Sequence, residues 1–333
     1  MRIVTESDIR RLVPLSLDVV AAVEDGFRAL GAGSVVTPPI LRLDLPESRG
    51  EMDVKTAHAR GWDTFAVKMS TGFFDNPARG LPSGDGLMVL VSAQTGTPVA
   101  LLLDGGYLTT VRTAAAGAVA AQWLAPKRVD TVGLVGSGVQ AWFQVRALLL
   151  VRRYRRVLVW SPTPDHARQL AERVIRDLHR EAEPTPDLER LVRTSDLVVT
   201  ATPSRVPLVE AKWLHAGQHI TAMGADAPDK QELAEDVWGR ADVRVCDVRT
   251  QALALGDSHH AVEAGILDPG RLLELGAVVA GRCPGRTASD QVTVCDLTGT
   301  GIQDTAVARL TYQRALAGEV GQELRPGERR TES

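Results

Sequence analysis

The chain has 333 residues, of which 44% are hydrophobic and 24% charged, so it can bury two separate cores, and disorder of the whole chain is excluded. Its 38 basic and 41 acidic residues give a formal net charge of −3, which argues against a nucleic-acid partner. The three cysteines are unevenly spaced and predict reduced thiols. We expect a cytoplasmic protein, because the start lacks a signal-peptide pattern and no apolar run approaches the roughly 18 to 20 residues of a membrane span.

The first third of the chain is predicted to form helices and then a sheet. Apolar residues at helical spacing indicate one or two helices over residues 1–35, the second ending at Gly31. Short β-rich runs separated by Gly, Pro, Asn and Asp over 36–104 are typical of a mixed or antiparallel sheet. The alanine-rich run 108–124 predicts a helix that bridges two domains.

From residue 130 onward, apolar strands alternate with helices. Helices are expected over 139–150, 164–180 and 230–239. Continuous apolar strands between helices predict a parallel sheet covered on both faces, which is a doubly wound α/β domain. A last strand and helix after about residue 290 are expected to return to the first domain, and the polar tail from Gly318 is predicted to be frayed.

The run 152–156 is the strongest charge cluster of the chain. It could bind phosphate or nucleic acid. The favoured interpretation is a solvated helix C-terminus, where the helix dipole attracts cations.

The segment VGLVGSGVQA, residues 132–141, predicts a strand, a glycine turn and a helix. Gly136 allows the tight turn, Gly138 lets a pyrophosphate approach the backbone, and Ala141 permits close helix packing. A lone glycine pattern is a weak signal, but this one has the strand and helix that the motif requires. The alternative is a structural glycine turn in another doubly wound protein.

The cofactor choice depends on the end of the next strand. An acid is expected there to bind the adenosine ribose, but Ser161 takes its place. Without that charge a 2′-phosphate is not repelled, and Ser161, Thr163 and Arg168 could donate hydrogen bonds to it. NADP(H) is therefore slightly favoured over NAD(H), although Asp165 lies nearby.

A carboxylate follows another predicted strand of this sheet. Asp226 lies in the loop 224–233, at the strand end where ligands bind in open parallel sheets. It could accept a proton from a substrate ammonium or hold an amine. An N-cap role for a helix after Pro228 is equally compatible with the spacing.

Five segments in order carry a family resemblance: LTTVRTAAAGAVAAQWLA, VGSGVQA, VVTATPSRVPLV, GADAPDKQEL and DLTGTGIQDTA. They resemble the ornithine cyclodeaminase and mu-crystallin family over nearly the whole chain. The segments GFFDNPARGLPSGDGLMVL and LTGTGIQDTA look closest to cyclodeaminase-like proteins of ectoine utilisation.

The resemblance implies a Rossmann-type doubly wound parallel sheet plus a split α+β substrate-binding and dimerisation domain. The substrate domain would comprise residues 1–115 completed by about 295–320, and the dinucleotide domain 116–294, with a flexible tail over 321–333. The resemblance further implies a homodimer formed through the sheet of the substrate domain, with the active site in the cleft between the two domains.

The resemblance also assigns roles to matching residues. Arg42, Lys68 and Arg112 would grip the substrate carboxylate. Asp226 would be the acid–base group, and Lys68 is a second candidate catalytic residue. The expected dinucleotide-binding residues are Ser83, Thr113, Gly136, Gly138, Val139, Gln140, Ser161, Thr163, Thr202, Asp226 and Lys230.

The three cations also have structural interpretations. Arg112 could be a paired buried charge, but no acid beside it is evident in the sequence, which favours an anion site. Lys68 could be a gatekeeper at a sheet edge. Arg42 lies between Leu41 and Leu43 and could face solvent.

The activity implied by the resemblance is cyclodeamination of ornithine or a related diamino acid, with internal hydride transfer by NAD or NADP and release of ammonia. Glu51 or Asp53 could bind the distal amine, whereas Lys55 would repel it. The alternatives are an NAD(P)H-dependent reductase of a cyclic imino acid or an ectoine-pathway intermediate, and a non-catalytic binding protein. The presence of Asp226 with two cations argues against pure binding.

No metal site is expected. His259 and His260 are adjacent, but the sequence shows no third ligand at metal spacing, so a loop or cap is favoured over zinc.

Overall fold

The computed structural model describes residues 1–324, which form two compact units. Unit 1 comprises Met1–Gly26, Gly33–Arg112 and the chain from Thr300 onward. Unit 2 comprises Phe27–Ala32 and Thr113–Gly299.

Unit 1 is built on a mainly antiparallel sheet in the order β18-β1-β7-β6-β5-β4-β2, with β3 also paired to β4. Its only parallel pair among the described strands is β1 with β7. The strands are β1 (Arg2–Thr5), β2 (Val35–Val36), β3 (Leu41–Leu45), β4 (Gly50–Ala59), β5 (Thr64–Phe73), β6 (Gly84–Ser92), β7 (Pro98–Leu103) and β18 (Gln322–Glu323).

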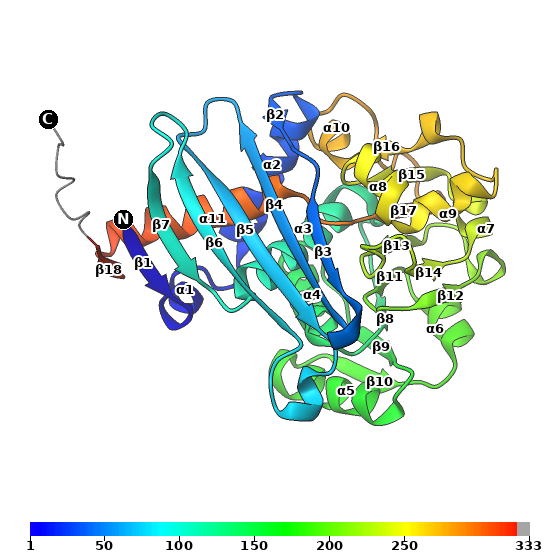
Figure 1. Ribbon diagram of the computed structural model, residues 1–333. Helices are drawn as coiled ribbons and strands as arrows, with labels where there is room; N and C mark the ends of the chain where they lie inside the picture. Colours follow the sequence, from blue (N-terminus) through cyan, green and yellow to red (C-terminus); the bar gives the residue numbers. More distant parts are fainter. Residues whose placement is uncertain (325–333) are drawn as a thin grey trace, which may run out of the picture. The chain divides into compact units, whose positions relative to one another are not determined.

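The last long helix, α11 (Gly301–Ala317), crosses this sheet (Figure 1). A Cβ at Gly301 would lie 2.5 Å from the Thr56 carbonyl, so only glycine permits this approach to β4. The Thr305 hydroxyl accepts a hydrogen bond from Ala66 N and donates one to Ala57 O, at 3.0 and 2.8 Å. These contacts hold the first turn of α11, and therefore Asp304, against β4 and β5.

Unit 2 is a parallel sheet in the order β10-β9-β8-β11-β13-β17-β15-β16, which confirms the predicted doubly wound fold. The strand order reverses between β8 and β11, the place where such sheets bind ligands. The strands are β8 (Thr131–Val135), β9 (Arg156–Trp160), β10 (Glu181–Pro184), β11 (Leu197–Thr200), β13 (His219–Ala222), β15 (Val243–Cys246), β16 (Leu273–Glu274) and β17 (Thr293–Asp296), with a separate pair of β12 (Arg205–Val209) and β14 (Gln231–Leu233).

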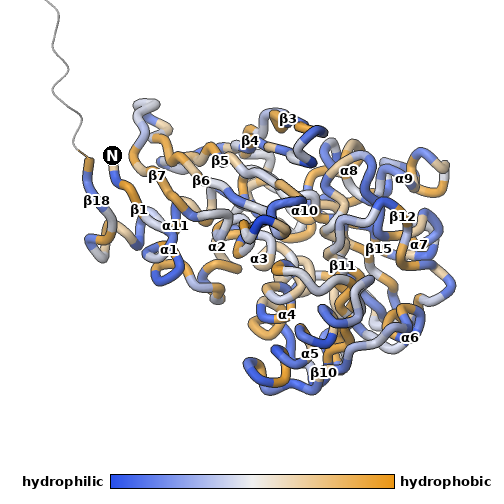
Figure 2. The backbone as a smooth tube through the Cα atoms, turned by 60° about the horizontal axis from the view of Figure 1, so that its bottom comes forward, coloured by the Kyte–Doolittle hydropathy of each residue, from blue (hydrophilic) through white to orange (hydrophobic). Residues whose placement is uncertain are grey.

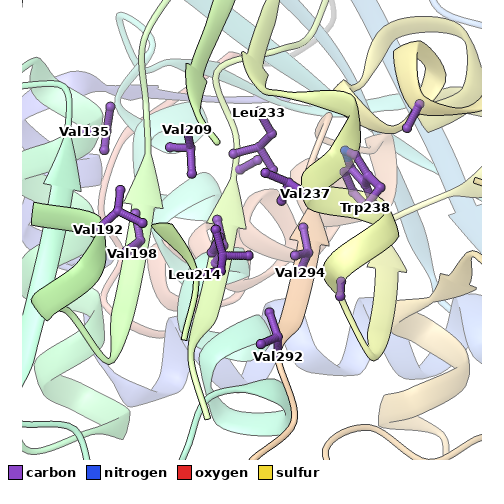
Figure 3. Close-up of a cluster of buried hydrophobic side chains, with 14 of the residues drawn as sticks. Val135, Val192, Val198, Val209, Leu214, Leu233, Val237, Trp238, Val292 and Val294 are labelled. Atoms are coloured by element: carbon purple, nitrogen blue, oxygen red, sulfur yellow. The ribbon is translucent and has the colours of Figure 1, made fainter. Parts of the chain in front are cut away.

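The remaining helices are α1 (Glu6–Leu12), α2 (Leu17–Gly31), α3 (Tyr107–Leu124), α4 (Val139–Val151), α5 (Pro164–Leu178), α6 (Leu188–Thr194), α7 (Glu235–Arg240), α8 (Arg249–Leu255), α9 (Asp257–Glu263) and α10 (Leu275–Val279). α5 alternates between hydrophilic and hydrophobic segments (Figure 2), as expected for a helix with one buried face. Apolar side chains from strands and helices of unit 2 meet in one buried cluster (Figure 3).

Three predictions about local structure are wrong in part. The expected helix 230–239 begins only at Glu235, because residues 231–233 form β14 beside β12. The tail is not frayed throughout, since β18 pairs with β1; its residues 325–333 lie outside the described part. The run 152–156 does follow the end of α4, and Arg153 and Arg155 are exposed, but Arg152 is half-buried: its guanidinium donates to the carbonyls of Ala121, Gln122 and Ala125, and so caps the end of α3.

Candidate functional site

The glycine turn of unit 2 has the geometry of a phosphate cradle. Gly136 has φ of +115°, and a Cβ there would lie 2.6 Å from Ala201 O, so the tight turn requires glycine. A Cβ at Gly138 would meet no heavy atom within 4 Å, so the backbone side of this residue is open. Because α4 begins at Val139, its first N–H groups can receive an anion at this place.

Ser161 lies directly after β9 and is buried. Its hydroxyl accepts hydrogen bonds from Ser137 Oγ at 2.9 Å and from Thr163 N at 3.3 Å. Asp165 does not offer a free carboxylate in place of the ribose-binding acid that is missing at Ser161, because it forms an ion pair with Arg168 at 3.0 Å. The end of β9 therefore presents hydroxyl groups with a cation nearby.

Glu232 ties together two loops at the carboxyl ends of the strands, and it was not anticipated from the sequence. Its side chain is fully buried and accepts hydrogen bonds from Thr200 Oγ1, from both N and Oγ1 of Thr202, and from Gly224 N, at 2.6 to 2.7 Å. Burial raises the pKa of Glu232, whereas the hydrogen bonds lower it. This carboxyl group holds Thr202, and the loop that leads to Asp226, in place.

Asp226 is ion-paired with Lys230, with 2.6 Å between Oδ1 and Nζ. The proposed N-cap role of Asp226 is wrong, since β14 and not a helix follows Pro228. The Asp226 side chain is 41% exposed, so its carboxylate is accessible to a ligand, whereas that of Lys230 is 11% exposed.

The other expected dinucleotide-binding residues occupy different places. Val139 is exposed and Gln140 half-buried in the first turn of α4. The Thr113 carbonyl accepts a hydrogen bond from Gln144 of α4 at 3.0 Å. Ser83 is not in unit 2 at all: it lies in unit 1, in an exposed turn before β6.

Unit 1 holds a buried cation pair on a single carboxylate. Lys68 on β5 and Arg112 on α3 are almost fully buried, and both contact Asp304 of α11. Lys68 Nζ lies 3.1 Å from Oδ2 and Arg112 Nε lies 3.0 Å from Oδ1. Another nitrogen of the Arg112 guanidinium donates to Gln303 Oε1 at 2.9 Å.

Further buried charged groups surround this carboxylate, among them Asp104, which interacts with Lys68 and Asp304. Lys55 is also buried and lies opposite Lys68 in the β4–β5 register, so three cations share the neighbourhood of Asp304. Burial lowers the pKa of Lys68 to about 7, against the opposing effect of Asp304. The buried Arg112 Nε has no well-aligned hydrogen-bond acceptor within the described chain. A substrate carboxylate could supply an acceptor for this nitrogen.

The structure corrects three expectations about these cations. An acid does lie beside Arg112, namely Asp304. Lys68 is not at a sheet edge, because β5 lies between β4 and β6. Arg42 does not simply face solvent, since its guanidinium lies 2.9 Å from Asp44 and 2.6 Å from Glu51.

The carboxylates on β4 lie on the same sheet face as the cations. Glu51, Asp53 and Lys55 alternate along β4 and therefore point to one side. Arg42 on β3 is opposite Asp53, with 3.6 Å between Arg42 Nη1 and Asp53 Oδ1. The face thus carries a cationic zone at Lys55 and Lys68 and an acidic zone at Glu51 and Asp53.

A glycine turn at the switch point of a doubly wound sheet, together with a second unit that buries two cations on one carboxylate, is typical of dinucleotide-binding enzymes. The chain belongs to the ornithine cyclodeaminase/mu-crystallin family, whose model matches residues 2–319. The family resemblance inferred from the sequence is thereby confirmed.

Individual relatives agree with this membership. An uncharacterised cyclodeaminase of Sinorhizobium fredii is 51% identical over 96% of this chain and 98% of its own length. An archaeal alanine dehydrogenase dimer with bound NAD is 34% identical, covers 98% of this chain and 99% of its own, and superposes with a TM-score of 0.90. The Δ1-pyrroline-2-carboxylate reductase of Thermococcus litoralis, solved with NADH and L-proline, is 29% identical, covers 97% of this chain and 100% of its own, and has a TM-score of 0.92.

Over residues 1–324, helices long and apolar enough to cross a membrane are absent.

Proposed function

We propose that the protein is an NAD(P)-dependent cyclodeaminase-like enzyme that acts at the Cα–N bond of ornithine or a related diamino acid. The observation that carries this proposal is the pairing of a cationic and an acidic zone on one sheet face of unit 1. Residues two apart on a strand are separated by about 7 Å. This spacing suits a small amino acid whose carboxylate binds Lys68 and Arg112 while its distal ammonium replaces Arg42 at Glu51 and Asp53.

When bound, the nicotinamide dinucleotide would supply reversible hydride transfer at the substrate Cα, which allows loss of ammonia without net redox change. Lys68 and Arg112 would orient the substrate by its carboxylate, with Asp304 fixing both cations. Asp226, held by Lys230, is the proposed base for the substrate ammonium and the acid for the departing amine.

An NAD(P)H-dependent reductase of a cyclic imino acid is the second candidate. Arg42 already neutralises the acidic zone through Glu51 and Asp53, so a substrate without a distal charge would also be accommodated. The similarity to a pyrroline-carboxylate reductase supports this candidate.

Turnover assays distinguish the two reactions. The purified protein is incubated with NAD⁺ or NADP⁺ and ornithine, diaminobutyrate or lysine, and ammonia and nicotinamide absorbance are followed together. Ammonia without net absorbance change supports cyclodeamination, whereas NAD(P)H consumption with pyrroline or piperideine carboxylates supports the reductase. Absence of both activities contradicts the proposal.

A variant tests the role of the acidic zone. Asp53→Asn is expected to raise KM for ornithine, because the distal ammonium of ornithine loses a negatively charged partner, and to leave the affinity for the dinucleotide unchanged. Asp75→Asn is the matched control, since Asp75 is an exposed partner of Arg49 in the same unit. An unchanged KM for ornithine in Asp53→Asn would show that Asp53 does not contact the distal amine.

The hydroxyl groups at Ser161 and Thr163 support NADP(H) as the preferred cofactor, with Arg168 exchanging Asp165 for a 2′-phosphate. We further propose a homodimer through unit 1, because Val36, Leu41 and Leu43 expose apolar side chains on β2 and β3. Light scattering of the purified protein measures the oligomeric state. An ectoine-related substrate stays a prediction.

A further inference from the structure

We propose that His259, His260 and Glu263 of α9 form a binding site for a divalent transition metal such as Zn²⁺. One ring nitrogen of each histidine and one carboxylate oxygen of Glu263 lie within 4.8 Å of one another. The two imidazole centroids are 3.8 Å apart. Glu263 thus supplies the third candidate ligand that the spacing in the sequence did not show.

Helical geometry explains why these residues converge. Successive residues on an α-helix are rotated by about 100°, so positions 259, 260 and 263 lie within one arc of about 100°. Glu263 is four residues after His259 and three after His260, which are the spacings at which side chains on a helix meet. One side of α9 therefore presents two imidazoles and a carboxylate together.

The hydrogen bonds of the two imidazoles leave one nitrogen of each ring available to a metal. His259 Nδ1 lies at hydrogen-bonding distance from Gly256 O, and His260 Nε2 lies 3.0 Å from Lys230 O. Because a carbonyl oxygen only accepts, these two nitrogens carry the protons. The lone pairs are then on His259 Nε2 and His260 Nδ1, which have no hydrogen-bond partner within residues 1–324.

This pattern is the one found around metal-binding histidines in general. Such a histidine donates its second ring N–H to a backbone carbonyl or a carboxylate, which fixes the tautomer and the ring orientation before the metal arrives. In this protein both rings have that support. A nitrogen–nitrogen–oxygen ligand set suits Zn²⁺ or Co²⁺ with water in a fourth position.

The burial of the three side chains indicates how the ion would enter. His259 is buried, His260 is half-buried and Glu263 is exposed, so the carboxylate lies on the solvent side of the two rings. An ion can approach from that side without opening the core. None of the three residues has been assigned above to the cofactor or to the substrate.

Metal binding by the untagged full-length protein tests the inference. After treatment with a chelator, the protein is dialysed against Zn²⁺, and Co²⁺ binding is followed by its visible absorption. We expect one ion per chain. Glu263→Gln should weaken binding by about tenfold or more, since even loss of an outer-shell partner costs that much.

His260→Ala should abolish the Co²⁺ spectrum, and His166→Gln is the matched control because His166 is an exposed histidine on α5. Circular dichroism checks that each variant is folded. No retained ion, or equal binding by Glu263→Gln, His260→Ala and His166→Gln, would overturn the proposal. A thiolate charge-transfer band would also overturn it, because it would assign the ion to a cysteine such as Cys283.

Discussion

Replacing Asp304 with Asn removes the one carboxylate that Lys68 and Arg112 share. Lys68 Nζ lies 3.1 Å from this carboxylate, and burial already lowers the pKa of Lys68 to about 7. At an effective dielectric constant of about 20, unit charges at this distance attract by on the order of 5 kcal/mol, which corresponds to about 4 pKa units. In Asp304→Asn, Lys68 should therefore be neutral at pH 7.

Neutral Lys68 would weaken the grip on the substrate carboxylate. A hydrogen bond to a charged group contributes about 1.5–3 kcal/mol, so kcat/KM should fall by about tenfold to a hundredfold at pH 7. The loss should diminish as the pH is raised toward 9, because Lys68 of the wild type then also loses its proton. The affinity for the dinucleotide should be unchanged, since the residues proposed to bind the dinucleotide, except Ser83, lie in unit 2.

The assay is kcat/KM from pH 5 to 9 for the wild type, Asp304→Asn and Asp63→Asn. Asp63 is the matched control, because it also pairs with an arginine of α11, Arg309, but is mostly exposed. If Asp304→Asn is folded and its pH profile matches that of the wild type, Asp304 does not control the protonation of Lys68, and the reasoning fails.

Three further predictions concern unit 2. Gly138→Val should leave the melting temperature nearly unchanged but abolish dinucleotide binding in a titration. Gly136→Ala should lower the melting temperature, because residue 136 has a positive φ and a Cβ there would collide with Ala201 O. Equal melting temperatures for the two variants would contradict this prediction. Ser161→Asp should shift the preference from NADP(H) to NAD(H) by about tenfold or more, since a buried charge that repels the 2′-phosphate costs more than about 1.4 kcal/mol of binding free energy. An unchanged ratio of kcat/KM for the two cofactors would exclude contact between residue 161 and the 2′-phosphate. Glu232→Gln should lower the free energy of unfolding, measured in urea, by about 1–3 kcal/mol. Each carboxylate oxygen of Glu232 accepts one backbone N–H, and the amide group of glutamine would leave one of these N–H groups unpaired. Wild-type stability of this variant would show that the two loops do not depend on the carboxylate.

The sequence determined the doubly wound sheet and its glycine turn. Both are local signals: continuous apolar strands alternate with helices, and glycine is required wherever the backbone has positive φ, as at Gly136. Sequence patterns do not report pairing with a distant strand. For that reason residues 231–233 were expected to be helical, although they pair with β12.

Only the tertiary structure decided how the buried charges are arranged. Asp304 reaches Lys68 and Arg112 because α11 packs on β4 and β5, and the neighbouring contact of Arg112 with Gln303 spans 191 residues of chain. Glu232 likewise gathers donors from two loops. A buried charge is stable only when a partner lies beside it in the folded chain, and that partner can come from any part of the sequence. The identity of the partner therefore depends on tertiary packing and cannot be predicted from local periodicity.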